Sequence, residues 1–113
     1  MNEIEKAFEY DEEFVQKLNA LGIRVNFYTS KNNEWNCDKI TVTTTWSFYT
    51  MKEARLEGFA RIDVEEGRAR ARLDKSRNVF DILGFQAAME VLSLITDKEK
   101  QLNEILGDKV EEI

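Results

Sequence analysis

Arginine side chains at alternate positions between Phe59 and Leu73 are the most distinctive chemical feature of this sequence. The segment reads FARIDVEEGRARARL, with apolar and charged residues in turn and one interruption at Glu66–Gly67. Because strand side chains alternate between two faces, this period of two predicts a β-hairpin with one buried and one solvent-exposed face. The exposed face would carry four arginines in a chain whose formal net charge is −6: Arg61, Arg68, Arg70 and Arg72.

The hairpin register follows from the side-chain chemistry. A two-residue turn at Glu66–Gly67 places every apolar residue of the hairpin on one face. It also sets two pairs of opposite charge against each other, Glu65 with Arg68 and Asp63 with Arg70. Arg61 and Arg72 oppose each other instead, at a cost of up to roughly 1 kcal/mol. An anion, a nucleic-acid phosphate or an acidic partner would relieve that repulsion.

Aromatic residues are expected on the same exposed face. Residues 23–29 and 39–50 have the alternation and the β-branched content of strands. The resulting sheet face would combine the arginines with four further residues: Arg24, Tyr28, Tyr49 and Phe59. Arginines among aromatic rings are typical of surfaces that bind single-stranded nucleic acid. The alternative is an ordinary solvated sheet face, and the acidity of the whole chain argues against nonspecific nucleic-acid binding.

One more candidate binding residue lies in the polar segment 30–38, which we expect to be a loop. Trp35 would be an interface anchor if its ring is exposed, because tryptophan is enriched at the centres of protein interfaces. If the ring folds back, it covers the core instead. Both interpretations remain open.

Catalytic, metal and cofactor sites are not expected. The chain contains no histidine, so the usual general base and the commonest metal ligand are both missing. Cys37 is the only cysteine, which leaves no internal disulfide and no thiolate cluster for zinc. The glycines form no phosphate-binding loop. We therefore expect a protein that is not an enzyme.

Helices are expected at both ends of the chain. Residues 3–21 repeat apolar residues at three- and four-residue steps, with Asn2 as the N-cap and Gly22 as the stop. A second helix begins near Asn78 and is apolar almost all round over residues 79–95. A capping box at residues 96–99 then predicts a break and a third helix, with one long bent helix as the alternative.

These elements predict a single α+β domain over residues 1–113. An N-terminal helix and a C-terminal helix or helix pair would pack on one face of a four-stranded antiparallel meander sheet. The apolar surface of residues 79–95 is wider than one sheet face covers, so this helix is either deeply buried between layers or shared with a second copy in a homodimer. No apolar run approaches the roughly 20 residues that cross a bilayer, so we expect no membrane segment. The single cysteine fits a cytoplasmic location.

The functional expectation is a small binding module that acts through contact with another protein. Regulators and inhibitors of larger machines, including phage-encoded anti-defence proteins, share this general build, although no motif in the chain supports that assignment. Single-stranded nucleic-acid or nucleotide binding on the arginine and tyrosine face is the second hypothesis.

Overall fold

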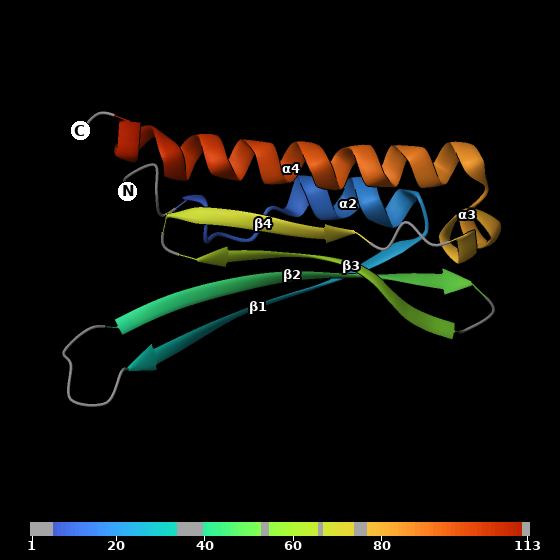
Figure 1. Ribbon diagram of the computed structural model, residues 1–113. Coiled ribbons are helices and arrows are strands. Elements are labelled where there is room, and N and C mark those ends of the chain that lie inside the picture. Colours follow the sequence, from blue (N-terminus) through green and yellow to red (C-terminus); the bar gives the residue numbers. More distant parts are fainter. Residues whose placement is uncertain (1–5, 34–39, 53–54, 66, 74–76, 112–113) are drawn as a thin grey trace.

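Two layers make up the protein, a twisted sheet and the helices that cover one face of it. The computed structural model describes residues 6–33, 40–52, 55–65, 67–73 and 77–111. The elements follow in the order α2 (Glu12–Ala20), β1 (Ile23–Asn33), β2 (Ile40–Lys52), β3 (Arg55–Glu65), β4 (Arg68–Leu73), α3 (Arg77–Leu83) and α4 (Phe85–Glu111). The strands form one antiparallel sheet in the order β1-β2-β3-β4, with α2 and α4 on the same side of it (Figure 1). The predicted α+β architecture is confirmed.

The core lies between this sheet and the helices. Alternate strand residues face the helices and are fully buried, as their period of two predicts: Thr44, Trp46 and Phe48 on β2, and Ile62 and Val64 on β3. The helices contribute Leu18, Val91, Ile95 and Leu102 to the same cluster. Burial of each large apolar side chain stabilises the fold by roughly 1.5–3 kcal/mol.

The hairpin between β3 and β4 has the predicted register. Val64 pairs with Ala69, Asp63 with Arg70, and Arg61 with Arg72. Gly67 has a φ of 94°, a left-handed conformation that glycine adopts without strain. The apolar and charged faces of this hairpin therefore separate as the alternation requires.

The helix predicted over residues 3–21 is interrupted, because residues 7–11 are not helical. Helix α2 begins at Glu12, and its N-cap is Asp11, whose Oδ1 accepts a hydrogen bond from the Phe14 backbone N–H at 3.1 Å. The predicted cap, Asn2, lies outside the described residues. Tyr10 has non-helical backbone, and its ring lies 5.6 Å from the ring of Phe27. The chain thus leaves helical geometry before Asp11 while Tyr10 packs against the sheet.

The strands are longer than predicted. β1 continues to Asn33, into the segment expected to be a loop, and β3 begins at Arg55 rather than at Phe59. The pairing of β2 with β3 shifts by one residue, because Phe48 pairs with Ala60 while Tyr49 pairs with Gly58. Phe59 is the extra residue of this β-bulge. Bulges bend a strand and increase its twist, so the sheet curves at this point.

The C-terminal helix pair breaks at a different place from the one predicted. Gly84, with a φ of 85°, separates α3 from α4, and α4 then runs without interruption from Phe85 to Glu111. The break predicted at residues 96–99 is wrong. Ile95 and Leu102 are both buried, and because they lie seven residues apart they share one helix face. Contact with the core therefore continues through the predicted break.

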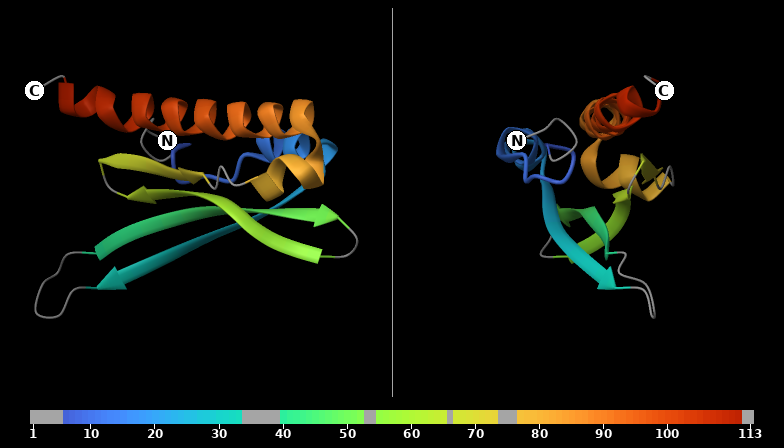
Figure 2. Two further views of the ribbon diagram at one scale, coloured as in Figure 1. Left: turned by 45° about the vertical axis from the view of Figure 1, so that its right-hand side comes forward. Right: turned by 90° about the vertical axis from the view of Figure 1, so that its left-hand side faces the viewer.

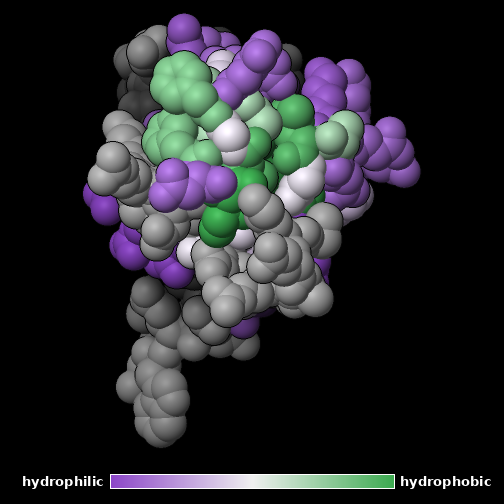
Figure 3. Space-filling model, turned by 90° about the vertical axis from the view of Figure 1, so that its right-hand side faces the viewer, coloured by the Kyte–Doolittle hydropathy of each residue, from purple (hydrophilic) through white to green (hydrophobic). Residues whose placement is uncertain are grey.

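An apolar surface lies at the end of the molecule where α3 meets α4. Figure 3 shows hydrophobic side chains gathered at this end. Phe85 is 74% exposed, and its ring stacks on that of Phe80 with 5.9 Å between centroids. Exposed aromatic surface of this kind is costly in water and often marks a contact site.

None of the helices within the described residues combines the length and the apolar character needed to span a bilayer.

Candidate functional site

A shallow hollow on the sheet face away from the helices is the candidate site. It encloses about 540 Å³ and crosses the sheet from β1 to β4. Its lining includes Tyr28, Ser47, Phe48, Tyr49, Gly58, Ala60, Arg61, Arg72 and Leu73. The hollow therefore brings together two tyrosines and two arginines that the sequence placed on this face.

Local backbone structure shapes this hollow. The bulge at Phe59 brings Gly58, instead of a residue with a side chain, opposite Tyr49. A Cβ atom at Gly58 would lie 3.3 Å from Cε1 of the Tyr49 ring, which is tighter than most real contacts. The absence of a side chain at Gly58 thus leaves room for the ring to lie over the backbone of β3.

The two opposed arginines differ in their ionic contacts. The Nε of Arg61 lies 3.1 Å from Oδ2 of Asp63, and Asp63 Oδ1 accepts a hydrogen bond from the Thr45 hydroxyl at 3.0 Å. Asp63 faces Arg70 and Glu65 faces Arg68 as expected, but neither pair forms an ion pair among the described residues. Asp63 instead contacts Arg61, two residues along its own strand. Arg72 forms no ion pair with any described residue. Its guanidinium group retains its capacity to bind an anion.

Exposed aromatic and cationic side chains of β1 border the hollow. Tyr28 is 54% exposed. The Arg24 guanidinium carbon lies 6.0 Å from the centre of the Tyr49 ring, at the limit of a cation–π contact. Arg24 Nη2 also donates a hydrogen bond to Asn26 Oδ1 at 3.2 Å. Arg24 is thus held beside one wall of the hollow while remaining exposed to solvent.

Arg68 and Arg70 are not among the residues that line the hollow. Arg68 and Arg70 are exposed toward the hairpin turn, where a second recess of about 70 Å³ is lined by Asp63, Glu65, Arg68, Arg70 and Arg72. Carboxylates therefore accompany these arginines. Phe59 is placed by its backbone in the bulge. Trp35 lies outside the described residues.

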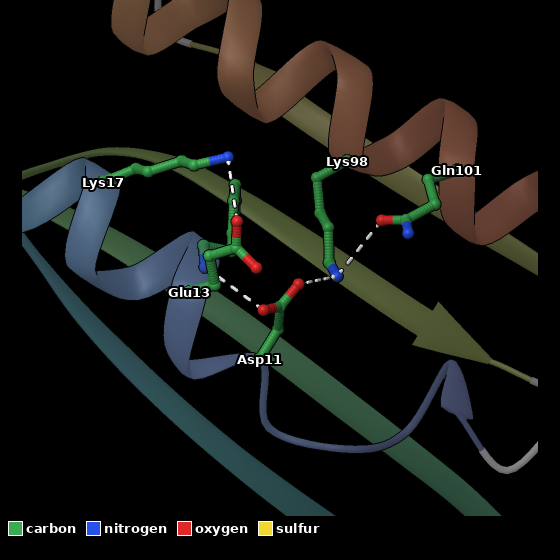
Figure 4. Close-up of polar contacts among 6 residues, drawn as sticks. Asp11, Glu13, Lys17, Lys98 and Gln101 are labelled. Carbon is green, nitrogen blue, oxygen red and sulfur yellow. Dashed lines mark hydrogen bonds and ion pairs between the residues drawn. The ribbon is translucent and has the colours of Figure 1, made fainter.

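A partly buried ion pair between the N-cap of α2 and α4 was not anticipated from the sequence (Figure 4). Lys98 is only 8% exposed, and its Nζ lies 2.7 Å from Asp11 Oδ2 and 3.3 Å from Gln101 Oε1. The same ammonium group lies 5.4 Å from the Phe14 ring centre and 5.7 Å from that of Trp46. Since the partners are 87 residues apart, no local pattern could have indicated this contact.

Asp11 is held in its charged form by these contacts. Partial burial raises the pKa of the Asp11 carboxyl group. The hydrogen bonds from Lys98 and from the Phe14 N–H, together with the positive charges of Lys98 and Lys17, lower this pKa by more than burial raises it. The net effect is a pKa below the usual 3.8. Because the pair joins a helix cap to α4, we assign it a structural role.

No group of three or more potential metal ligands occurs among the described residues. The candidate site consists of the two arginines and two tyrosines of the hollow. Comparison of the chain with family models, curated proteins and solved structures gives no match.

Proposed function

We propose that this protein is a non-enzymatic binding module that captures an acidic segment of another protein on its open sheet face. One observation carries the proposal: Arg61 and Arg72 are direct cross-strand partners, and both line the hollow that Tyr28 and Tyr49 also line. A guanidinium group binds a carboxylate through two parallel hydrogen bonds, and tyrosine rings supply apolar contact area beside it. A partner carboxylate would also relieve the opposition of the two arginines.

The charge of the whole chain favours a short acidic segment over a long polyanion. The net charge of −6 repels an extended phosphate backbone, whereas a partner with a few carboxylates can meet the local arginines. Binding of this kind suits a regulator or inhibitor of a larger assembly. A cytoplasmic location belongs to the proposal, supported by the single cysteine.

Reversing the two central charges tests the proposal. The probe is a fluorescein-labelled peptide that alternates glutamate with valine or threonine, and its binding is followed by fluorescence anisotropy at low and moderate salt. The double variant Arg61→Glu/Arg72→Glu is expected to bind about a hundredfold more weakly, because each lost charge-assisted contact weakens binding about tenfold. The wild-type affinity should also fall as salt rises.

A matched control separates the hollow from general electrostatics. Arg68→Glu/Arg70→Glu changes the net charge by the same amount on the same sheet face, at residues that do not line the hollow. This variant should retain most of the affinity of the wild-type protein. Equal losses in both double variants, or no binding of the peptide to the wild-type protein, would contradict the proposal.

Single-stranded nucleic acid is the second candidate ligand. The exposed Tyr28 ring and the position of Arg24 beside Tyr49 favour it, since base stacking needs an accessible aromatic face. An oligothymidine of similar length therefore belongs in the same experiment. Tighter binding of the oligonucleotide than of the peptide, lost in Arg61→Glu/Arg72→Glu, would assign the hollow to nucleic acid.

Self-association through residues 79–95 is a separate proposal, supported by the exposed apolar side chains of Phe85 and Met89. A two-fold dimer would bury the same apolar surface on both copies. The mass from light scattering is expected to rise with protein concentration, and Phe85→Asp should abolish the rise. Thr96→Asp, an exposed α4 position beyond residue 95, is the control. A monomer mass at every concentration would refute the dimer.

A further inference from the structure

The two edge strands of the sheet, β4 and β1, differ in whether side chains of other elements bind their outward backbone groups. Along β4, α4 supplies side chains that bind the outward backbone groups. Asn103 Oδ1 accepts from the Ala69 N–H at 2.8 Å, and Asn103 Nδ2 donates to the Ala69 carbonyl at 3.1 Å. Glu99 accepts from the Ala71 N–H. This edge is therefore closed to another strand.

The opposite edge, β1, has no such cover. Within the described part of the chain, the hydrogen bonds to the β1 backbone are those of its ladder with β2. The consecutive residues Tyr28, Thr29, Ser30 and Lys31 are all exposed. In Figures 1 and 2 the later half of β1 diverges from the helices, and no described helix or strand lies along its outer side. The strand thus presents unpaired backbone groups to an extended ligand.

The charged residues of β1 determine which kind of strand can pair with this edge. The β1 sequence, Ile23–Asn33, contains two bases, Arg24 and Lys31, and no acid. A second copy paired on this edge would bring four positive side chains together along the seam between two β1 strands. Arg24 lies on the open sheet face, and Lys31, an odd number of residues further along β1, lies on the opposite face. An acidic segment instead meets Arg24 with the carboxylates that it places on the open face.

We propose that the partner segment binds as a fifth strand on the outer edge of β1. Its backbone pairs with β1, and its alternate acidic side chains lie over the open sheet face beside Arg24 and Tyr28. Tyr28 belongs to β1 and also lines the hollow, so the paired part of the segment adjoins the hollow at Tyr28. The residues that follow the paired part cross the open sheet face to Arg61 on β3 and Arg72 on β4. This inference rests on the proposed function and adds its binding mode, strand addition to the sheet.

The test uses backbone-methylated forms of the alternating peptide, which leave the protein unchanged. In a paired strand only every second residue directs its N–H toward the neighbouring strand. One peptide therefore carries N-methyl groups on three internal glutamates, and its isomer carries them on three of the intervening residues. One isomer is expected to bind about a hundredfold more weakly than the other, because three lost hydrogen bonds each reduce affinity about fivefold.

The outcomes separate this inference from the proposed function. If the unmodified peptide binds and the two isomers bind equally, whether both strongly or both weakly, strand addition is overturned and the acidic-segment proposal stands. If the unmodified peptide does not bind, the proposed function itself fails. Arg24→Glu should weaken binding of the unmodified peptide about tenfold, through loss of one charge-assisted contact beside the edge.

A second copy of the chain is the other possible occupant of the β1 edge, and it needs its own test. Light scattering on Phe85→Asp, with and without the peptide, addresses it. A monomer in both conditions agrees with the proposal. A dimer that persists and excludes the peptide would assign the β1 edge to another copy of the chain and overturn the proposal.

Discussion

Trp46→Ala is expected to lower the free energy of unfolding by about 4 kcal/mol, within the range for removal of a large buried aromatic side chain. Trp46 is fully buried, and three aromatic rings surround it. The ring centres of Phe27, Phe14 and Tyr10 lie at 4.5, 5.5 and 5.9 Å from that of Trp46. We expect these neighbours to fill the resulting cavity only in part, because the structure around a truncated core residue relaxes incompletely. Urea unfolding followed by circular dichroism measures the change.

Trp46→Phe is the matched control for this prediction. The Trp46 indole N–H is buried and has no hydrogen-bond partner among the described residues. Its removal therefore costs no hydrogen bond and leaves only the loss of ring volume. We expect Trp46→Phe to destabilise the protein by about half as much as Trp46→Ala. Equal effects of the two substitutions would show that the phenylalanine ring recovers none of the packing of Trp46, and would contradict this prediction.

The sheet could be predicted from the sequence because its determinants are local. The alternation of apolar and polar residues predicted which face each strand residue lies on. The charged and apolar residues of the hairpin predicted one register, and the structure confirms that register. The bulge at Phe59 was missed, because nothing in the alternation marks an extra residue there. The juxtaposition of Arg61 with Arg72 could therefore be predicted, whereas the position of Gly58 under Tyr49 could not.

The helix boundaries depended on contacts between distant residues. Asn2 and Asp11 are both of residue types that cap helices well. At Asp11, contacts between distant residues add to the cap, because Lys98 binds the Asp11 carboxylate and the neighbouring Tyr10 ring stacks on Trp46. The capping box at residues 96–99 was overridden because Lys98 and Glu99 bind other elements and Ile95 and Leu102 enter the core. Local preferences of about 1 kcal/mol are smaller than such tertiary contributions.

Lys98→Ala is expected to lower the free energy of unfolding by about 2 kcal/mol, below the usual 3–5 kcal/mol for breaking a buried ion pair. The discount reflects the Asp11 side chain, which is 34% exposed and keeps part of its hydration. The substitution removes the ion pair and the contacts of the ammonium group with the Phe14 and Trp46 rings. Lys98→Met retains most of the aliphatic volume, so the difference between the two variants separates packing from charge.

The same pair predicts how stability depends on pH. The folded-state pKa of Asp11 is below 3.8, its ordinary value in the unfolded chain. The unfolded state therefore binds the proton more readily, so the contribution of Asp11 is complete well above pH 3.8 and is lost as pH falls through the folded pKa. Unfolding measured from about pH 6 to about pH 3 should show a smaller acid-induced loss of stability in Lys98→Met than in the wild-type protein. Parallel pH profiles for the two proteins would rule out Lys98 as the group that keeps Asp11 ionised.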